Sequence, residues 1–156
     1  MAKWRQVALT TGGLVLADQL TKLAAWHWLA PLERIKLIPG FFDLTFVLNT
    51  GVAFGLMSGR PDLVRVLFLT GAAFFALGVI TVFIAKADPR QRLFLWGLAL
   101  VAGGAVGNII DRLRLSAVID FLDFYLGSYH WPAFNLADAG ITVGTGFIII
   151  HLWRTR

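Results

Sequence analysis

The chain has 156 residues, of which 58% are hydrophobic and 15% are charged. Its mean hydropathy of +0.74 is too high for an ordinary soluble domain and predicts a protein whose solvent is the lipid bilayer. Because a spanning helix needs about 20 residues, this length accommodates about four crossings and leaves no room for a separate soluble catalytic domain. The sequence has no cysteine, which excludes a disulfide, a thiolate nucleophile and a cysteine-ligated metal.

Four apolar segments follow one another along the chain, at residues 7–28, 63–85, 93–110 and 136–153. Each is about long enough to cross roughly 30 Å of hydrocarbon at about 1.5 Å per residue. In the third segment, Gly103, Gly104 and Gly107 predict a close contact with a neighbouring helix. We therefore expect an all-α, polytopic membrane protein with four transmembrane helices, forming a single domain over residues 1–156.

The first segment carries Asp18, Gln19 and Lys22 in its interior and lacks a small-residue cleavage site after the apolar run. These features favour a retained span over a removed signal peptide. Asp18 and Lys22 are spaced i, i+4, so they can pair on one helix face and help the helix to pack. A role of the same pair in binding is the alternative.

Residues 35–57, between the first two segments, show a different pattern. Phe, Val and Thr alternate partly with other residues, and Gly and Pro punctuate the run. This pattern is typical of short strands. We expect a small extracytoplasmic β-sheet that rests on the membrane surface.

The basic residues, which give a formal net charge of +5, lie mostly at the ends of the apolar segments. This distribution argues against a nucleic-acid partner and predicts the orientation in the membrane, because cytoplasmic loops are enriched in Lys and Arg. The side with only one acid, Asp88, is expected to be cytoplasmic, with both termini on it. Its basic residues are Lys3, Arg5, Lys86, Arg90, Arg92, Arg154 and Arg156.

Polar residues collect at the opposite, outward edge. Asp120 follows the third segment and Asp138 lies in the first turn of the fourth, so the chain returns both to the same edge. Two carboxylates in a partly desolvated site do not both ionise easily, so the pair can hold one proton and activate a water. The alternative is that they are solvated loop residues, which is our interpretation of Asp123.

Other chemistries fit less well. No serine lies in a Gly-x-Ser-x-Gly elbow, and the three histidines are scattered without the spacing of a zinc site. We expect no metal and no cofactor. At the end of the third segment, Asp111 and Arg112 can form a local ion pair, or Arg112 can hold a backbone carbonyl.

Five motifs resemble, in order and spacing, those of the lipoprotein signal peptidase family, also called signal peptidase II. The resemblance covers nearly the whole chain, and five motifs in order are far more specific than any one. They are DQLTK at residues 18–22, NTGVAF at 49–54, GNIIDR at 107–112, VIDF at 118–121 and FNLADAGI at 134–141.

The resemblance implies a four-helix aspartic endopeptidase of the bacterial cytoplasmic (inner) membrane, with its active site near the outer face. It would cleave the signal peptide from prolipoproteins that carry a diacylglyceryl-modified cysteine, with membrane lipids as its surroundings. A non-enzymatic membrane protein, with Asp18 and Lys22 as a relay, is the competing hypothesis. By motif, the catalytic pair is Asp120 and Asp138; Asn49, Asn108, Arg112 and Asn135 line the substrate site; and Asp18, Lys22 and Asp111 support it.

Overall fold

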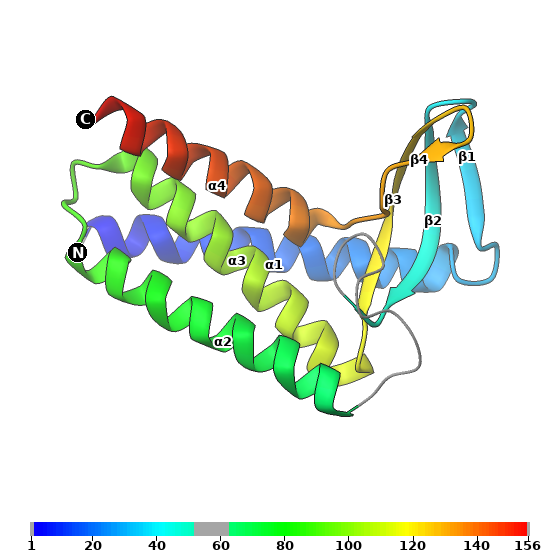
Figure 1. Ribbon diagram of the computed structural model, residues 1–156, viewed down its shortest axis with the longest axis horizontal. Coiled ribbons are helices and arrows are strands. Elements are labelled where there is room, and N and C mark those ends of the chain that lie inside the picture. The colour runs from blue at the N-terminus through cyan, green and yellow to red at the C-terminus, as the bar shows by residue number, and fades with distance from the viewer. Residues whose placement is uncertain (1, 52–62, 156) are drawn as a thin grey trace.

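The computed structural model describes residues 2–51 and 63–155, and these form four long helices and a four-stranded sheet (Figure 1). Both termini and the connection between the second and third helices lie at one end of the molecule, and the sheet lies at the other. In chain order the elements are α1 (Ala2–Trp28), β1 (Arg34–Ile38), β2 (Phe42–Asn49), α2 (Leu63–Lys86), α3 (Arg92–Leu115), β3 (Val118–Leu126), β4 (Tyr129–His130) and α4 (Leu136–Arg154).

Helix α3 is the centre of the helical part, because it contacts α1, α2 and α4. Small residues permit the close approach. A side chain at Gly104 would collide with the backbone of Ala137 on α4, and one at Gly107 would lie 2.5 Å from Asp18 Oδ2 on α1. The predicted glycine contact is therefore confirmed. Gly104 allows α4 to pack closely on α3, and Gly107 allows α1 to do the same.

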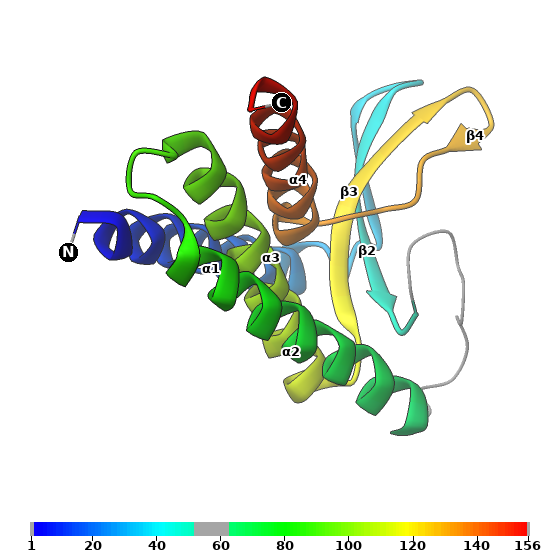
Figure 2. The same ribbon diagram turned by 60° about the vertical axis from the view of Figure 1, so that its left-hand side comes forward.

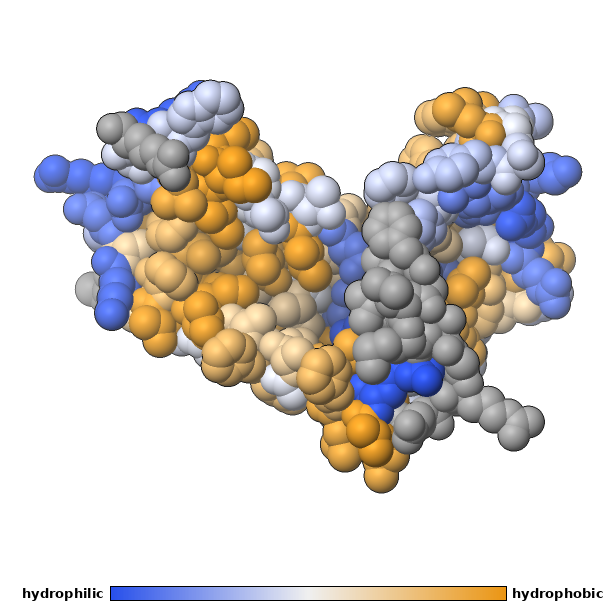
Figure 3. All heavy atoms as spheres, viewed as in Figure 1, coloured by the Kyte–Doolittle hydropathy of each residue, from blue (hydrophilic) through white to orange (hydrophobic). Residues whose placement is uncertain are grey.

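Three helices, α2, α3 and α4, are long and apolar enough to cross a membrane among the residues described. Their outer surface is apolar, and Figure 3 shows hydrophobic side chains over the helices with a hollow between α4 and the sheet. Helix α1 is as long but does not reach the same hydropathy, because it contains Asp18, Gln19 and Lys22. The chain is thus a multi-pass membrane protein. Three of the four expected spans are found among the described residues, and hydropathy does not confirm the fourth, α1.

The sheet is antiparallel in the order β1-β2-β3-β4, and its strands run across the ends of the helices (Figure 2). Strand β2 and all of β1 except its first residue, Arg34, fall within the predicted strand segment 35–57. Residues 52–57 of that segment lie outside the described residues. Strands β3 and β4 were not predicted. Their signals are present in the β-branched and aromatic run 118–126 and in the Gly127-Ser128 turn, where Gly127 has φ +60°.

The third helix extends past its predicted end at Ile110 and continues to Leu115. It stops where Ser116 adopts a left-handed conformation with φ 56°, and the Ser116 N–H bonds the carbonyl of Arg112 at 3.0 Å. Asp111 and Arg112, which follow the predicted end, consequently lie on the helix together with Asn108. The extension brings Asp111 to strand β3, where its Oδ2 accepts the N–H of Ile119.

Candidate active site

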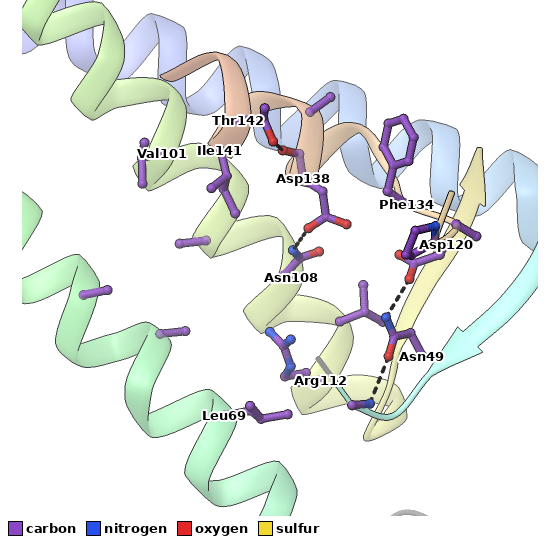
Figure 4. Close-up of a pocket in the computed structure, with 18 of the residues that line it drawn as sticks. Asn49, Leu69, Val101, Asn108, Arg112, Asp120, Phe134, Asp138, Ile141 and Thr142 are labelled. Atoms are coloured by element: carbon purple, nitrogen blue, oxygen red, sulfur yellow. Dashed lines mark hydrogen bonds between the residues drawn. The ribbon is translucent and has the colours of Figure 1, made fainter. Parts of the chain in front are cut away.

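A cavity of about 790 Å³ opens between α2, α3, α4 and the sheet (Figure 4). One end is polar and is lined by side chains from four elements: Asn49, Asn108, Arg112, Asp120 and Asp138. The rest is apolar and follows α2, α3 and α4 toward the opposite end of the bundle. Leu69, Ala73, Ala76, Ile80, Val101, Ala105, Ile141 and Val143 line this apolar part.

Strand β3 places Asp120, which pairs with Val47 on β2 and is 1% exposed. Both carboxylate oxygens accept hydrogen bonds from neutral amides. Asn49 Nδ2 donates to Oδ2 at 2.8 Å, and Asn135 Nδ2 donates to Oδ1 at 2.7 Å. The carboxylate is therefore fixed in orientation without a direct ion pair among the described residues.

Burial raises the pKa of Asp120 to about 7, well above its usual value of 3.8. Desolvation is the largest cause, and the nearby charge of Asp138 raises the pKa further, whereas the hydrogen bonds from Asn49 and Asn135 and the charge of Lys22 lower it. A carboxyl group with this pKa holds a proton for much of the time at neutral pH. Such a group can donate a hydrogen bond as well as accept one.

The first turn of α4 places Asp138. The helix begins at its N-cap, Asn135, whose side-chain oxygen accepts the backbone N–H of Asp138 at 2.9 Å. Asn108 Nδ2 on α3 donates to Asp138 Oδ1 at 2.8 Å. Figure 4 shows Asp138 directed into the cavity that Asp120 also lines. The structure therefore brings together the two carboxylates that the sequence analysis paired.

The three asparagines predicted to line the substrate site all hold these carboxylates. Asn49 and Asn108 also line the cavity, but Asn135 is fully buried and does not line it. The Asn135 side-chain amide contacts Asn108 Oδ1 at 3.3 Å and the carbonyl of Ile119 at 3.2 Å in addition to Asp120. What Asn135 does in the structure is to join α3, β3 and α4 behind the carboxylates.

A buried charged cluster of Asp18, Lys22 and Asp111 lies behind the asparagines. Lys22 Nζ contacts Asp18 Oδ2 at 3.0 Å and Asp111 Oδ2 at 2.8 Å, and it donates to Asn108 Oδ1 at 3.0 Å. All three charged side chains are at most 2% exposed. The predicted pairing of Asp18 with Lys22 is confirmed, and the cluster connects it to the amide that orients Asp138.

Backbone contacts tie the same cluster to both catalytic candidates. Asp18 Oδ1 accepts the N–H of Ala137, the residue before Asp138, at 2.9 Å. Asp111 Oδ2 accepts the N–H of Ile119, the residue before Asp120, at 3.2 Å. The sequence analysis assigned no role in the site to Gln19, whose side-chain amide donates to Asp18 and Asp111 at 3.2 and 3.1 Å. Its polar side chain beside Asp18, within an otherwise apolar segment, was the feature that could have indicated this role.

Two predictions for individual residues need correction. Asp111 pairs with Lys22 and not with its neighbour Arg112, because adjacent helical residues point to different faces. Arg112 instead lines the cavity, where Figure 4 shows it below Asn108. Asp123 is not a solvated loop residue. It is 4% exposed on β3, and it contacts His130 Nδ1 at 2.9 Å and Arg34 at 3.2 Å.

Fold and site together define a multi-pass membrane protein with a two-carboxylate polar site at one end of its helices. The model of the family "Signal peptidase (SPase) II" matches residues 10–154. The chain therefore belongs to the signal peptidase II family, which consists of membrane proteases that process lipoproteins.

Individual relatives agree with this assignment. The chain is 43% identical over 146 residues to a lipoprotein signal peptidase of Syntrophus aciditrophicus, covering 92% of this chain and 89% of that protein. It is 44% identical over 161 residues to one of Burkholderia thailandensis, covering 100% and 91%. A bacterial membrane enzyme solved by the in meso method at 2.3 Å resolution superposes with a TM-score of 0.81 at 29% identity, covering 96% of this chain and 88% of that one.

Proposed function

We propose that this protein is an aspartic endopeptidase that removes the signal peptide from diacylglyceryl-modified bacterial prolipoproteins, cleaving before the lipidated cysteine. The observation that carries the proposal is the presence of Asp120 and Asp138 in one cavity, each held by neutral amides. Membership of the signal peptidase II family supports the substrate class. The reaction requires only water and the two carboxyl groups, so the proposal includes no metal and no cofactor.

In the proposed mechanism Asp120 holds the shared proton, which its raised pKa favours. Ionised Asp138 takes a proton from a water molecule as the water oxygen attacks the scissile carbonyl carbon. Protonated Asp120 donates a hydrogen bond to the carbonyl oxygen and stabilises the tetrahedral intermediate. Collapse of this intermediate breaks the C–N bond, and the amine nitrogen leaves with the proton taken from water.

The two parts of the cavity suit the two parts of such a substrate. The apolar part follows the helices and suits a hydrophobic signal peptide and acyl chains. The polar part must receive an extended stretch of backbone, because helical carbonyls are already hydrogen-bonded and inaccessible to water. We propose that Arg112 binds a substrate carbonyl there. Asn49 and Asn108 contact the substrate with those side-chain polar groups that do not bond the carboxylates.

We also propose that α1 is a fourth span, so that residues 1–156 form one membrane domain with both termini in the cytoplasm. Asp18 and Lys22 in α1 are buried and contact α3 and α4 rather than lipid, which removes most of their cost in a membrane. The basic residues near both termini and between α2 and α3 lie at the end away from the sheet. This distribution supports the proposal that the site lies at the outer face of the cytoplasmic membrane.

A thiol-labelling experiment tests the orientation. Ser128 and Pro89 are both exposed, at opposite ends of the molecule, and the native chain has no cysteine. In intact cells an impermeant thiol reagent should label Ser128→Cys and not Pro89→Cys. The reverse pattern would place the carboxylates on the cytoplasmic face and overturn the orientation.

The test of the function is cleavage of a purified diacylated prolipoprotein by the full-length protein in detergent. Release of the signal peptide is expected, and the same precursor without its diacylglyceryl group should be processed poorly. A folded sample that cleaves neither substrate would favour a non-enzymatic membrane protein. Cleavage of both at equal rates would support a peptidase but contradict the lipid-dependent substrate class.

A further inference from the structure

Each of the three asparagines beside the carboxylates can present either its oxygen or its nitrogen to a neighbour, because a half-turn of the side-chain amide exchanges the two atoms. In two of them a backbone N–H occupies the oxygen. The oxygen of Asn49 accepts the N–H of Gly51 at 2.9 Å. The oxygen of Asn135 accepts the N–H of Asp138 at the same distance. Both amide nitrogens are thereby left to donate to Asp120, at 2.8 and 2.7 Å.

Asn108 differs from the other two, because a charged side chain occupies its oxygen. The ammonium group of Lys22 donates to Asn108 Oδ1 at 3.0 Å. The nitrogen of Asn108 is left to donate to Asp138 at 2.8 Å. A half-turn of Asn108 would set its amide hydrogens against the ammonium group and its oxygen against the carboxylate of Asp138. Both contacts would lack a hydrogen bond, and both would place like partial charges together.

Asn135 is the other donor to the oxygen of Asn108, and it is the weaker one. Its contact with Asn108 Oδ1 is longer, at 3.3 Å. Its nitrogen carries two hydrogens, and it has closer acceptors in Asp120 at 2.7 Å and in the carbonyl of Ile119 at 3.2 Å. The orientation of Asn108 therefore depends mainly on Lys22.

The surroundings of Lys22 direct one of its hydrogens to Asn108. An ammonium group has three N–H donors, and Nζ contacts three acceptors, which are Asp18 Oδ2 at 3.0 Å, Asp111 Oδ2 at 2.8 Å and Asn108 Oδ1 at 3.0 Å. The two carboxylates are held in turn by backbone N–H groups of α4 and β3. Lys22 is buried, so its position is set by these contacts.

We propose that Lys22 is a positioning residue, which fixes the side-chain amide of Asn108 so that it donates to Asp138. A hydrogen bond donated to a carboxylate favours its ionised form, which is the form of Asp138 that acts as the base. Lys22 is not among the described residues that line the cavity of the carboxylates, so it acts through Asn108. The inference rests on the proposed function, because it assigns Lys22 a part in the same reaction.

The first test replaces Lys22 with methionine in the full-length protein in detergent. Lys22→Met should lower kcat per folded molecule about tenfold or more, since a hydrogen bond from a charged donor is lost, and it should change KM less than about twofold. Thr11→Val is the matched control, because it removes a different side-chain hydrogen bond from α1 to α3, the bond of Thr11 to the carbonyl of Ala99 at 2.9 Å. It should lower the melting temperature and leave kcat unchanged.

A double-mutant cycle separates an effect through Asn108 from a direct effect of the charge on the carboxylates. When Asn108→Ala is already present, Lys22→Met should lower kcat by less than about threefold. A loss as large as in the wild-type background would show that Lys22 acts by its charge alone, and it would overturn the proposal. A folded Lys22→Met variant with normal kcat and a lower melting temperature would do the same, because Lys22 would then be a structural residue.

Amide hydrogen exchange tests the orientation of Asn108 without using cleavage. In isotope-labelled protein, the side-chain amide signals of Asn108 are those that Asn108→Ala removes from the NMR spectrum. The hydrogen bonded to Asp138 should exchange slowly in the wild type and about tenfold faster in Lys22→Met, as expected for the same lost hydrogen bond. Equal exchange in the two proteins would overturn the proposal.

A second variant replaces Lys22→Met if that protein does not fold. Lys22→Met combined with Asp111→Asn removes one ammonium group and one carboxylate, so the formal charge of the cluster with Asp18 stays at −1. The exchange measurement also separates this inference from the proposed function. A wild-type protein that shows the expected exchange but cleaves no prolipoprotein would contradict the proposed function and still support the role of Lys22 in orienting Asn108.

Discussion

Strand β3 carries two buried aspartates, Asp120 and Asp123, whose hydrogen-bond and charge partners differ. The difference distinguishes a candidate catalytic carboxylate from one that stabilises the sheet. Both are less than 5% exposed. Asp120 accepts hydrogen bonds from the neutral amides of Asn49 and Asn135. Asp123 contacts the cation Arg34 at 3.2 Å and His130 at 2.9 Å.

A second carboxylate lies near each of these aspartates, and its surroundings show the same difference. Asp123 stands directly opposite Asp43 in the sheet, and Arg34 contacts both carboxylates, with Tyr125 donating to Asp43 at 3.1 Å. Asp120 shares its cavity with Asp138, which is likewise held by an amide. A cation stabilises the charged form of a carboxylate, whereas an amide orients it and leaves more of the desolvation cost in place. Asp120, which amides hold, therefore remains able to exchange a proton at neutral pH.

The largest expected effect comes from removing either member of the amide-held pair. Asp120→Asn and Asp138→Asn should each lower the cleavage rate by about 10³-fold or more, because an amide can neither accept the proton of water nor share one. Specific activity per folded molecule, with folding checked by thermal melting, is the measurement. Substantial turnover by either variant would remove that residue from the catalytic pair.

Replacing Arg112 should have an intermediate effect. Arg112→Ala should reduce kcat/KM by roughly ten- to a hundredfold, since an unmade contact to substrate in a poorly hydrated site costs about 1 to 3 kcal/mol. The melting temperature should change little. If the variant instead melts earlier but keeps normal activity per folded molecule, Arg112 is a structural residue and not a substrate ligand.

Changing the pH should produce a similar or smaller effect. The pKa of Asp120 is raised to about 7, so this group is protonated below that pH and ionised above it. If protonated Asp120 supports the reaction, kcat/KM should fall about tenfold for each pH unit above about 7. A profile that stays flat to pH 9, in a sample that remains folded, would show that the shared proton is held elsewhere.

The cation-held aspartate should give the smallest effect on activity. Asp123→Asn removes one of two carboxylates from Arg34, which is half-exposed, so we expect a loss of about 1 to 2 kcal/mol in the free energy of unfolding. Activity per folded molecule should remain within about twofold of wild type. Asp43→Asn is the matched comparison. An inactive but folded Asp123→Asn would show that Asp123 takes part in catalysis, which would contradict its assignment as a structural residue.

Local sequence patterns were sufficient for the helices and for the first half of the sheet. Long apolar runs specify α2, α3 and α4, because backbone polar groups in lipid must be bonded within the segment. Gly104 and Gly107 marked the contact between helices because closely approaching backbones leave no space for a side chain. The carboxylates Asp120 and Asp138 were identifiable because a charged residue beside an apolar span is costly and so calls for a reason.

Tertiary structure decided what those residues touch. The pairing of β3 with β2 buries Asp123 opposite Asp43, which no local pattern shows, because burial of a strand face depends on its partner strand. The same pairing brings Asn49 to Asp120 from 71 residues away. Lys22 joins α1 to Asp111 and Asn108 on α3. The sequence by itself determined which residues are polar where lipid is the solvent, whereas only the folded chain determined whether each carboxylate meets an amide or a cation, since hydrogen bonds act over about 3 Å between segments far apart in the chain.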